Sequence, residues 1–337
     1  MTITGFKIKN KRTNAKFLAL AMISLLAFNS SSHFITSANA QMSDSAPNSS
    51  SCMCVIFRLD DVTSTFLPTV QQSILEQFIS ENQSLSLGLV MHNIDPASPV
   101  TTLVKEGKQK GLFELDIHGW DHVDYAQLSQ EEQFGTLQQA DSKMHAIFGQ
   151  YSQVFIPPYN KFDGDTIGVL RPIGIKILSA DTTSDKASYF VSNGNTMVST
   201  PTLYHLPAVA TFKSDNGNGT WTKVPISTIL DQIDFHVSKY GYAVVLLHPQ
   251  NFAQMKDNVF VDTVDENQIR DLSSLIHSIK SKNLKITTFA GVTGLNNIST
   301  VSHVQTVPEF QNTLPIVFVL SVIIGFVILR QNKFGRK

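Results

Sequence analysis

Short apolar runs alternate along the chain with longer segments that have helical periodicity. The apolar runs have the length and composition of buried parallel strands, and they cover residues 55–59, 85–91, 113–117, 154–156, 175–179, 243–247 and 285–289. The amphipathic segments predict helices over residues 68–80, 100–110, 130–148, 166–171, 226–240 and 266–282. Ser129 and Glu132 form a capping-box pattern at the start of the third helix. This alternation predicts an α/β fold on a parallel sheet.

The number of strand–helix units bears on the architecture. About seven units fall within residues 54–291, enough to close the sheet into a (β/α) barrel. An open, doubly wound sheet is the alternative. Residues 189–224 interrupt the alternation with turn-forming Asn and Gly around short strand-like pieces, and we expect a β-rich insertion there over the carboxyl ends of the strands. Neither a glycine-rich phosphate loop nor an internal repeat occurs in the sequence, so nucleotide chemistry is not expected.

Composition narrows the class of protein. The chain has 337 residues, 42% of them hydrophobic and 16% charged, which is enough for one large domain or two small ones. A net charge of −1 offers no electrostatic basis for binding nucleic acid. The two cysteines, Cys52 and Cys54, would point to one face of an extended strand, which is poor geometry for a mutual disulfide. We expect them to be buried packing residues, with metal ligation as the alternative.

The amino-terminal part of the chain has the layout of a secretory signal. Basic residues precede an apolar run over 17–28, and small residues over 38–40 then offer a cleavage point. Residues 1–40 are therefore expected to be a signal peptide; an uncleaved membrane anchor is the alternative. Residues 41–53, rich in Ser, Asn and Pro, are expected to be a linker to a catalytic domain over residues 54–291.

The carboxyl-terminal part predicts a membrane segment. After a linker over 292–313, residues 314–329 are almost wholly apolar, and the basic tail over 330–337 is expected in the cytoplasm. Together with Pro308-Glu309-Phe310, this arrangement resembles the archaeal Pro-Glu-Phe type of sorting signal, whose tail a membrane transpeptidase removes. A plain transmembrane anchor is the alternative. Both interpretations place the domain outside the cell, on the membrane or envelope.

Carboxylates and imidazoles follow the first and third predicted strands. Asp60 and Asp61 are adjacent, and their mutual repulsion is costly unless a cation or hydrogen bonds offset it. His118 and His122 have a spacing that can bring two imidazoles onto one divalent ion, with a carboxylate oxygen as the third ligand. Taken singly, the aspartates fit a solvated turn and each histidine fits a surface or core position. Together they predict a metal hydrolase site.

Three more polar residues follow later strands. Tyr159 comes after two prolines, Asp181 follows a strand, and His248 ends another. The structural alternatives are an aromatic residue on a rigid turn, a turn-forming aspartate and a neutral core histidine. Because the carboxyl ends of parallel strands meet at one edge, the position of His248 favours a functional role.

The ordered set of these motifs resembles the polysaccharide deacetylase family, carbohydrate esterase family four, in its Arg-x-Asp-Asp and His-Gly-x-x-His branch. The motifs are Arg58-Leu59-Asp60-Asp61, His118-Gly119-Trp120-Asp121-His122, Pro157-Pro158-Tyr159, Asp181 and Leu247-His248. The resemblance covers about residues 54–291. It implies a distorted seven-stranded (β/α) barrel and metal-dependent hydrolysis of N-acetyl or O-acetyl groups on a sugar polymer. With the predicted export, this polymer would be an exported or cell-surface polysaccharide.

The resemblance also implies roles for individual residues. Asp61, His118 and His122 would hold one divalent ion, with zinc expected and cobalt, nickel or manganese as alternatives. Asp60 would be the general base. The backbone N–H of Tyr159 would help to hold the oxyanion, His248 would protonate the leaving amine, and Asp181 would orient that histidine.

The sequence departs from the family pattern at two places. The family normally carries an arginine just before the prolines of the third motif, where this chain has Ile156. Arg58 lies two residues before Asp60 on a strand and shares its face, so we hypothesise that Arg58 holds this carboxylate and keeps it ionised. Arg58 and Leu59 also replace the usual Thr and Phe, so the substrate need not be chitin or peptidoglycan. The alternative functions are a catalytically weak or inactive carbohydrate-binding protein and a structural envelope domain.

Overall fold

The computed structural model describes residues 52–181, 203–215 and 221–295. The predicted signal peptide, the Pro-Glu-Phe tripeptide and the apolar segment over 314–329 lie outside these residues. Within the described part of the chain, no helix combines the length and the apolar character needed to cross a membrane.

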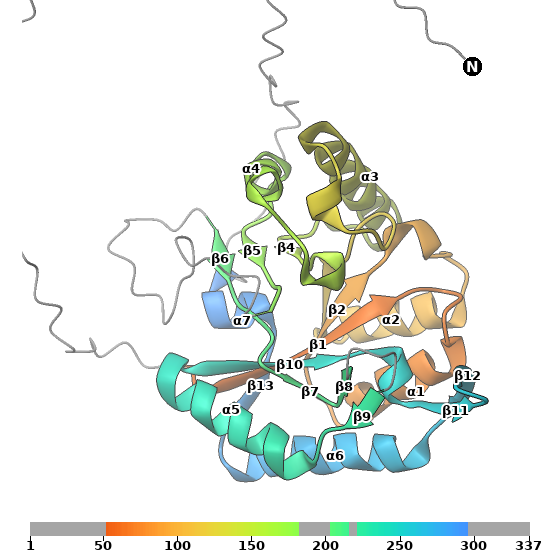
Figure 1. The fold of residues 1–337 in the computed structure, drawn as a ribbon, viewed down its shortest axis with the longest axis vertical. Helices are drawn as coiled ribbons and strands as arrows, with labels where there is room; N and C mark the ends of the chain where they lie inside the picture. The colour runs from red at the N-terminus through yellow and green to blue at the C-terminus, as the bar shows by residue number, and fades with distance from the viewer. Residues whose placement is uncertain (1–51, 182–202, 216–220, 296–337) are drawn as a thin grey trace, which may run out of the picture. The chain divides into compact units, whose positions relative to one another are not determined.

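Parallel strands form the centre of the domain (Figure 1). They are β1 (Cys54–Val62), β2 (Leu85–Leu89), β3 (Phe113–Ile117), β4 (Val154–Phe155), β5 (Ile177–Leu178), β6 (Tyr204–His205), β7 (Ala210–Thr211), β10 (Tyr242–Leu247) and β13 (Lys285–Thr287). The order across the sheet is β6-β5-β4-β3-β2-β1-β10-β7, and β13 pairs with the first half of β1. Every residue from Cys54 to Asp60 is buried, as expected for a strand covered on both faces.

The segment that carries β6 and β7 joins the two edges of this sheet. β6 pairs with β5, and Ala208 then forms a parallel bridge with Asp181. β7, only a few residues later, pairs with β10. The hydrogen-bonded path of parallel strands therefore returns from β5 to β10, which supports the barrel rather than the open sheet.

The prediction of a β-rich insertion over 189–224 is wrong for residues 204–211, which belong to the main sheet. β6 and β7 have only two residues each, so the apolar pattern of a strand is not visible in the sequence. β8 (Lys213–Asp215) and β9 (Trp221–Lys223) do form a separate antiparallel pair, as expected of an insertion. Residues 182–202 and 216–220 lie outside the described residues. A second antiparallel pair, β11 (Ala253–Lys256) with β12 (Val259–Val264), was not predicted.

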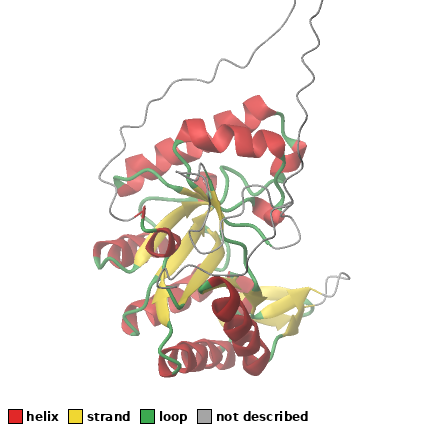
Figure 2. Cartoon of the chain, turned by 90° about the vertical axis from the view of Figure 1, so that its left-hand side faces the viewer, coloured by secondary structure: helices red, strands yellow, loops and turns green. Residues whose placement is uncertain are grey.

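Helices surround the strands (Figure 2). They are α1 (Pro68–Ser80), α2 (Pro99–Gln109), α3 (Gln130–Phe148), α4 (Gly164–Ile173), α5 (Ile226–Tyr240), α6 (Glu266–Ser281) and α7 (Phe289–Thr293). Short 3-10 turns follow several strands, namely η1 (Met91–Asn93), η2 (Tyr125–Gln127), η3 (Pro158–Asn160) and η4 (Pro249–Asn251). The predicted capping box at Ser129 and Glu132 is confirmed: each residue accepts a backbone N–H of the other.

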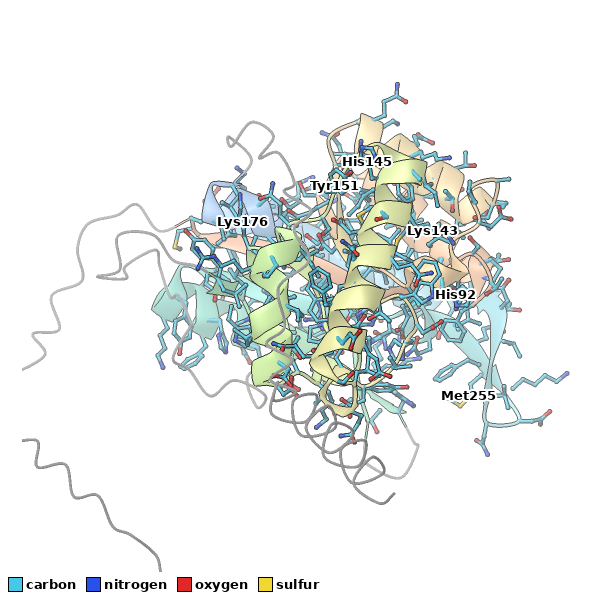
Figure 3. The ribbon with its side chains drawn as sticks, turned by 90° about the horizontal axis from the view of Figure 1, so that it is seen from above. His92, Lys143, His145, Tyr151, Lys176 and Met255 are labelled. Carbon is cyan, nitrogen blue, oxygen red and sulfur yellow. A yellow bond between two sulfur atoms is a disulfide. The ribbon has the colours of Figure 1, made fainter. Side chains whose placement is uncertain are left out.

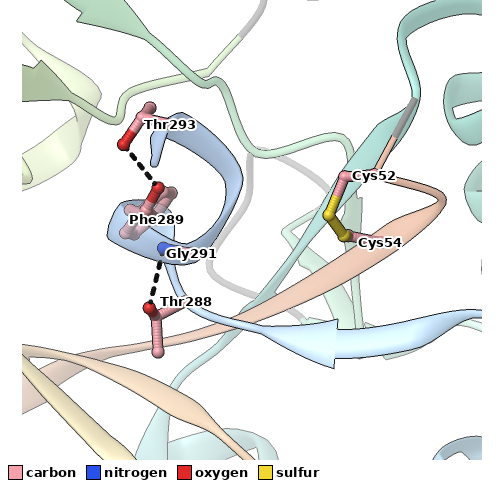
Figure 4. The surroundings of a disulfide bond; sticks show 6 residues. All are labelled: Cys52, Cys54, Thr288, Phe289, Gly291 and Thr293. Carbon is pink, nitrogen blue, oxygen red and sulfur yellow. Dashed lines mark hydrogen bonds between the residues drawn. A yellow bond between two sulfur atoms is a disulfide. The ribbon is translucent and has the colours of Figure 1, made fainter. Parts of the chain in front are cut away.

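The prediction that Cys52 and Cys54 remain unpaired is wrong, because they form a disulfide (Figure 4). Their Cα atoms are 5.1 Å apart, within the usual range for a disulfide. Met53 between them has a φ of 49°, so the backbone is not extended at this point. The prediction assumed that both cysteines lie on an extended strand, and the left-handed conformation of Met53 shows that they do not.

A buried carboxyl on α3 provides a test of stability against pH. Asp141 accepts a hydrogen bond from the backbone N–H of Ser152 at 2.8 Å, and burial raises its pKa from 3.8 to about 7. Because the folded-state pKa is the higher one, the proton stabilises the fold fully below about pH 4, and this contribution is lost as the pH rises through about 7. Asp141→Asn retains the acceptor and cannot ionise. We expect it to stabilise the protein by about 1–3 kcal/mol at about pH 8, with no gain near pH 4.

Thermal or denaturant unfolding of both proteins across this pH range measures the effect. If the stability of the wild-type protein and that of Asp141→Asn run parallel from acidic to alkaline pH, Asp141 does not titrate as inferred.

Candidate metal and catalytic site

β1 and β3 bring a carboxylate and two imidazoles to one point at their carboxyl ends. Asp61 ends β1 in a left-handed conformation, with a φ of 61°. Its Oδ1 lies 3.3 Å from Nε2 of His118 and 3.1 Å from Nε2 of His122. Among the described residues, these three form the group whose ligand atoms, all within 4.8 Å of one another, could hold a metal ion. The structure therefore brings together the three residues predicted from the sequence to bind a metal.

The surroundings of the two imidazoles set their orientation. Nδ1 of His118 lies 2.8 Å from the carbonyl oxygen of Ile156, so this nitrogen donates and Nε2 faces Asp61. The ring of His122 contacts the ring of His118 and the ring of Tyr159, with centroids 5.1 and 4.4 Å away. An imidazole whose outer nitrogen is bonded to a carbonyl is the usual arrangement of a histidine that binds metal.

The charges at this point fit a cation. Burial would raise the pKa of Asp61, but the adjacent imidazoles of His118 and His122 lower it far below its usual range. For His118, burial would lower the pKa, and the negative charges of Asp60 and Asp61 raise it above its usual value. The group thus combines an ionised carboxylate with two imidazoles, the donor types that bind a divalent cation. The residues present fit a bound metal.

Arg58 holds both oxygens of Asp60. Its Nε donates to Oδ1 at 2.9 Å and its Nη2 donates to Oδ2 at 2.7 Å. Both residues are almost fully buried, with relative exposures of 0% and 3%. The two side chains point to the same side of β1, as their spacing predicted. The geometry required by the hypothesis that Arg58 holds Asp60 is therefore present.

The rest of the Arg58 guanidinium is held by residues that the sequence analysis missed. Nη1 donates to the carbonyl oxygen and hydroxyl of Ser179, at 3.0 and 2.9 Å, and to the carbonyl oxygen of Ala180 at 3.2 Å. Nη2 donates to Oδ1 of Asn160 at 3.1 Å. Asn160 directly follows the Pro-Pro-Tyr motif and Ser179 lies two residues before Asp181, so proximity to the motifs was the only available indication.

His248 directly follows β10, and the charges of Asp60 and Asp61 act on it. Its backbone N–H donates to Asn251 at 2.8 Å, and its Nδ1 has no hydrogen-bond partner among the described residues. Burial lowers the pKa of His248, although the charges of Asp60 and Asp61 act in the opposite direction. Asp181 forms a backbone bridge with Ala208. Its predicted role in orienting His248 stays a prediction.

Two carboxyl groups inside the barrel were also missed. Glu114 accepts hydrogen bonds from the Ser86 hydroxyl at 2.8 Å and from the first backbone N–H groups of α7, those of Phe289 and Ala290, at 2.9 Å each. Asp116 is fully buried, and neither of its oxygens has a hydrogen-bond partner in the described part of the chain. Burial raises the pKa of Asp116 well above its usual value, which favours the neutral acid. Their alternation with His118 along β3 was the available indication.

Four aromatic side chains of the domain lie in different surroundings. Tyr125 is fully buried and therefore belongs to the core, whereas Tyr159 is 60% exposed. The ring of Trp221 lies 6.5 Å from that of His248. The Trp120 ring stacks on His92, whose Nδ1 lies 2.6 Å from Oδ1 of Asp121.

Figure 3 shows His92 and Lys143 close together at the edge of the domain, where Lys143 donates to the carbonyl oxygen of His92 at 3.0 Å. His92 lies outside the group of three candidate metal ligands.

One protein-family model matches part of the chain. Residues 51–178 match the family model described as polysaccharide deacetylase. This stretch contains Asp60, Asp61, His118 and His122, and it ends before His248. No curated protein matches the chain.

Several solved structures resemble the domain. The Xyl-CE4 domain of a multidomain xylanase from the hindgut metagenome of Trinervitermes trinervoides has 13% identity and a TM-score of 0.46, covering 73% of this chain and 92% of that one. A family 4 acetyl xylan esterase from Clostridium thermocellum, in complex with a cobalt ion, has 13% identity and a TM-score of 0.47, covering 73% and 93%. A CE4 family pseudoenzyme from Bacillus anthracis has 14% identity and a TM-score of 0.45, covering 71% and 65%.

Proposed function

We propose that this protein is a metal-dependent hydrolase that removes N-acetyl or O-acetyl groups from an exported or cell-surface polysaccharide. The observation that carries the proposal is the meeting of Asp61, His118 and His122 at one point. Asp60, adjacent to Asp61 in the chain, is held there by Arg58. The match of residues 51–178 to the polysaccharide deacetylase family supports it, because that stretch contains all five residues.

Asp61, His118 and His122 would hold one divalent ion, with zinc expected and cobalt, nickel or manganese as alternatives. When bound, such an ion polarises a carbonyl group and lowers the pKa of water. The hydrogen bond from Nδ1 of His118 to the carbonyl oxygen of Ile156 keeps Nε2 directed at Asp61.

Asp60 is the proposed general base. The paired hydrogen bonds from Arg58 fix the plane of the carboxylate. Each oxygen retains a lone pair, so Asp60 can accept the proton that water loses as it attacks the acetyl carbonyl. The backbone N–H of Tyr159 is the proposed donor to the oxyanion.

His248 is the proposed proton donor to the departing amine or alcohol. Burial lowers its pKa, so the protonated form is a stronger acid than an exposed imidazolium. Asp181, which follows β5, is proposed to orient it. In this scheme Asp60 removes one proton from water and His248 supplies one to the leaving group.

The location of the protein is also a proposal. Residues 1–40 would direct export, and residues 314–329 would hold the domain at the outer face of the membrane unless a sorting transpeptidase removes the tail. The partners would then be an acetylated glycan and the membrane.

The second candidate is a carbohydrate-binding envelope protein with weak or no turnover. Ile156, at the position where the family normally has an arginine, favours it. The double contact of Arg58 with Asp60 supports the hydrolase instead, because the base still has a guanidinium partner.

Acetate release separates the two candidates. We expect the zinc-loaded full-length protein to release acetate from at least one of three glycan classes: chitin oligomers, peptidoglycan fragments or surface glycans. Asp60→Asn should reduce the rate at least about 100-fold while it retains the metal, because only the proton acceptor is lost. Binding of an oligosaccharide without acetate release, by a protein that carries its metal, would establish the second candidate.

A further inference from the structure

The turn η3 holds two consecutive residues in the left-handed region. Tyr159 has a φ of 57° and Asn160 a φ of 55°. Asparagine tolerates this region, whereas an aromatic side chain there is uncommon and costs free energy. The Tyr159 side chain is 60% exposed, so burial of its ring offers little compensation. Strain of this kind is concentrated at functional sites, where the surrounding structure maintains it.

Both residues of the turn contact the site. The Tyr159 ring lies 4.4 Å from the ring of His122, one of the candidate metal ligands. Oδ1 of Asn160 accepts a hydrogen bond from Nη2 of Arg58 at 3.1 Å. The same Nη2 donates to Oδ2 of Asp60 at 2.7 Å. Asn160 therefore touches Arg58 at the nitrogen that binds the proposed base.

The acceptors around Arg58 are unevenly distributed. Nη1 has three oxygen acceptors, contributed by Ser179 and Ala180. Nη2 has two acceptors, and one of them is Asn160. Among the residues that the structure describes, loss of this amide would leave Asp60 as the only acceptor of Nη2, and Arg58 could then tilt towards the residues that bind Nη1. Because a guanidinium only donates, the amide oxygen rather than its nitrogen must face Arg58.

We propose that Asn160 is a positioning residue for Asp60, acting through Arg58; the inference rests on the proposed function. The amide suits this task because it is neutral. A carboxylate at this position would compete with Asp60 for the positive charge of Arg58. The left-handed backbone is what brings the amide oxygen to Nη2, and the fold retains this conformation despite its cost at Tyr159.

Asn160→Gly tests the proposal, because glycine adopts this φ without strain and removes only the amide. We expect kcat for acetate release to fall about 10-fold with KM and the melting temperature unchanged, a loss typical of a misplaced catalytic group. Asn160→Asp retains the acceptor and the backbone conformation, and we expect it to lower kcat as well, because its charge competes with Asp60. A merely structural role would lower stability and leave kcat intact.

Asn82→Gly is the matched control. Asn82 has a φ of 52°, is exposed and follows α1, outside the described site, so its replacement should leave kcat unchanged. Proton exchange at Nε of Arg58, followed by NMR and assigned with Arg58→Lys, provides a readout that needs no turnover. We expect Asn160→Gly to accelerate this exchange and Asn82→Gly to leave it unchanged.

The two readouts separate the possible failures. If the wild-type protein releases no acetate from any glycan but Asn160→Gly accelerates proton exchange at Nε of Arg58, the proposed function fails and the positioning of Arg58 by Asn160 stands. If kcat and proton exchange in Asn160→Gly both match the wild type, the positioning role is overturned.

Discussion

Asp61→Asn is expected to abolish metal binding and hydrolysis together. Asp61 supplies the only carboxylate of the candidate ligand group, and its Oδ1 lies within 3.3 Å of both imidazoles. A neutral amide is a poor ligand for a divalent ion beside two neutral imidazoles, because the site loses its negative charge. Replacing an outer-shell partner already costs roughly 10–100-fold in metal affinity. We therefore expect Asp61→Asn, and likewise His118→Gln, to lose more than about 100-fold in affinity and in kcat/KM.

Elemental analysis of the full-length protein after zinc dialysis measures the first part of this prediction. The wild-type protein should hold one zinc per chain, and both variants should hold none. Asp121→Asn is the control: Asp121 is adjacent to His122 but its side chain pairs with His92, outside the ligand group. A wild-type protein that binds no zinc, cobalt, nickel or manganese under these conditions would remove the basis for the hydrolytic assignment.

Arg58→Met is expected to produce the largest loss of stability. The Arg58 and Asp60 side chains are 0% and 4% exposed. Removing the guanidinium leaves the carboxylate buried without its counter-charge. Breaking a buried ion pair in this way typically costs about 3–5 kcal/mol. Activity should fall as well, because Asp60 loses both of the hydrogen bonds that hold its carboxylate in place. Arg58→Lys should be intermediate, because an ammonium group cannot bind both oxygens in parallel.

A double-mutant cycle isolates the pair. Arg58→Met combined with Asp60→Asn removes both charges, and we expect it to be more stable than Arg58→Met alone. Chemical denaturation of the four proteins gives the coupling free energy. A cost below about 1 kcal/mol for Arg58→Met would show that the pair contributes no more than an exposed salt bridge. Unchanged turnover in Arg58→Lys would refute the role of the paired hydrogen bonds in catalysis.

Most elements could be predicted where the sequence pattern is long. The prediction of a helix over 68–80 coincides with α1, because Pro68 fits the first turn and four apolar residues form one buried stripe. The strand predicted over 113–117 coincides with β3, where apolar residues occupy every second position and are buried. By contrast, β6 and β7 have two residues each, and neither a period of two nor an apolar run is detectable over that length.

Tertiary contacts also supply groups that local patterns cannot. The start of α1 has no capping side chain of its own, and Asp262, on β12, accepts hydrogen bonds from the backbone N–H groups of Thr69 and Val70. The disulfide between Cys52 and Cys54 depends on the left-handed φ of Met53. Methionine rarely adopts this conformation, so the sequence does not indicate it. The first feature depends on a contact between segments that are far apart in the chain, and the second depends on the local conformation of the backbone.

The position of Asp60, Asp61, His118 and His248 at one end of the sheet could be predicted from the sequence alone. Parallel strands run in the same direction, so residues that end such strands share an edge whatever the details of packing. The surroundings of Arg58 could not be predicted, because they depend on tertiary contacts: Ser179 and Asn160 lie 121 and 102 residues away from it in the chain. Hydrogen-bond partners are selected by distances across the barrel interior, and no periodicity along the chain encodes those distances.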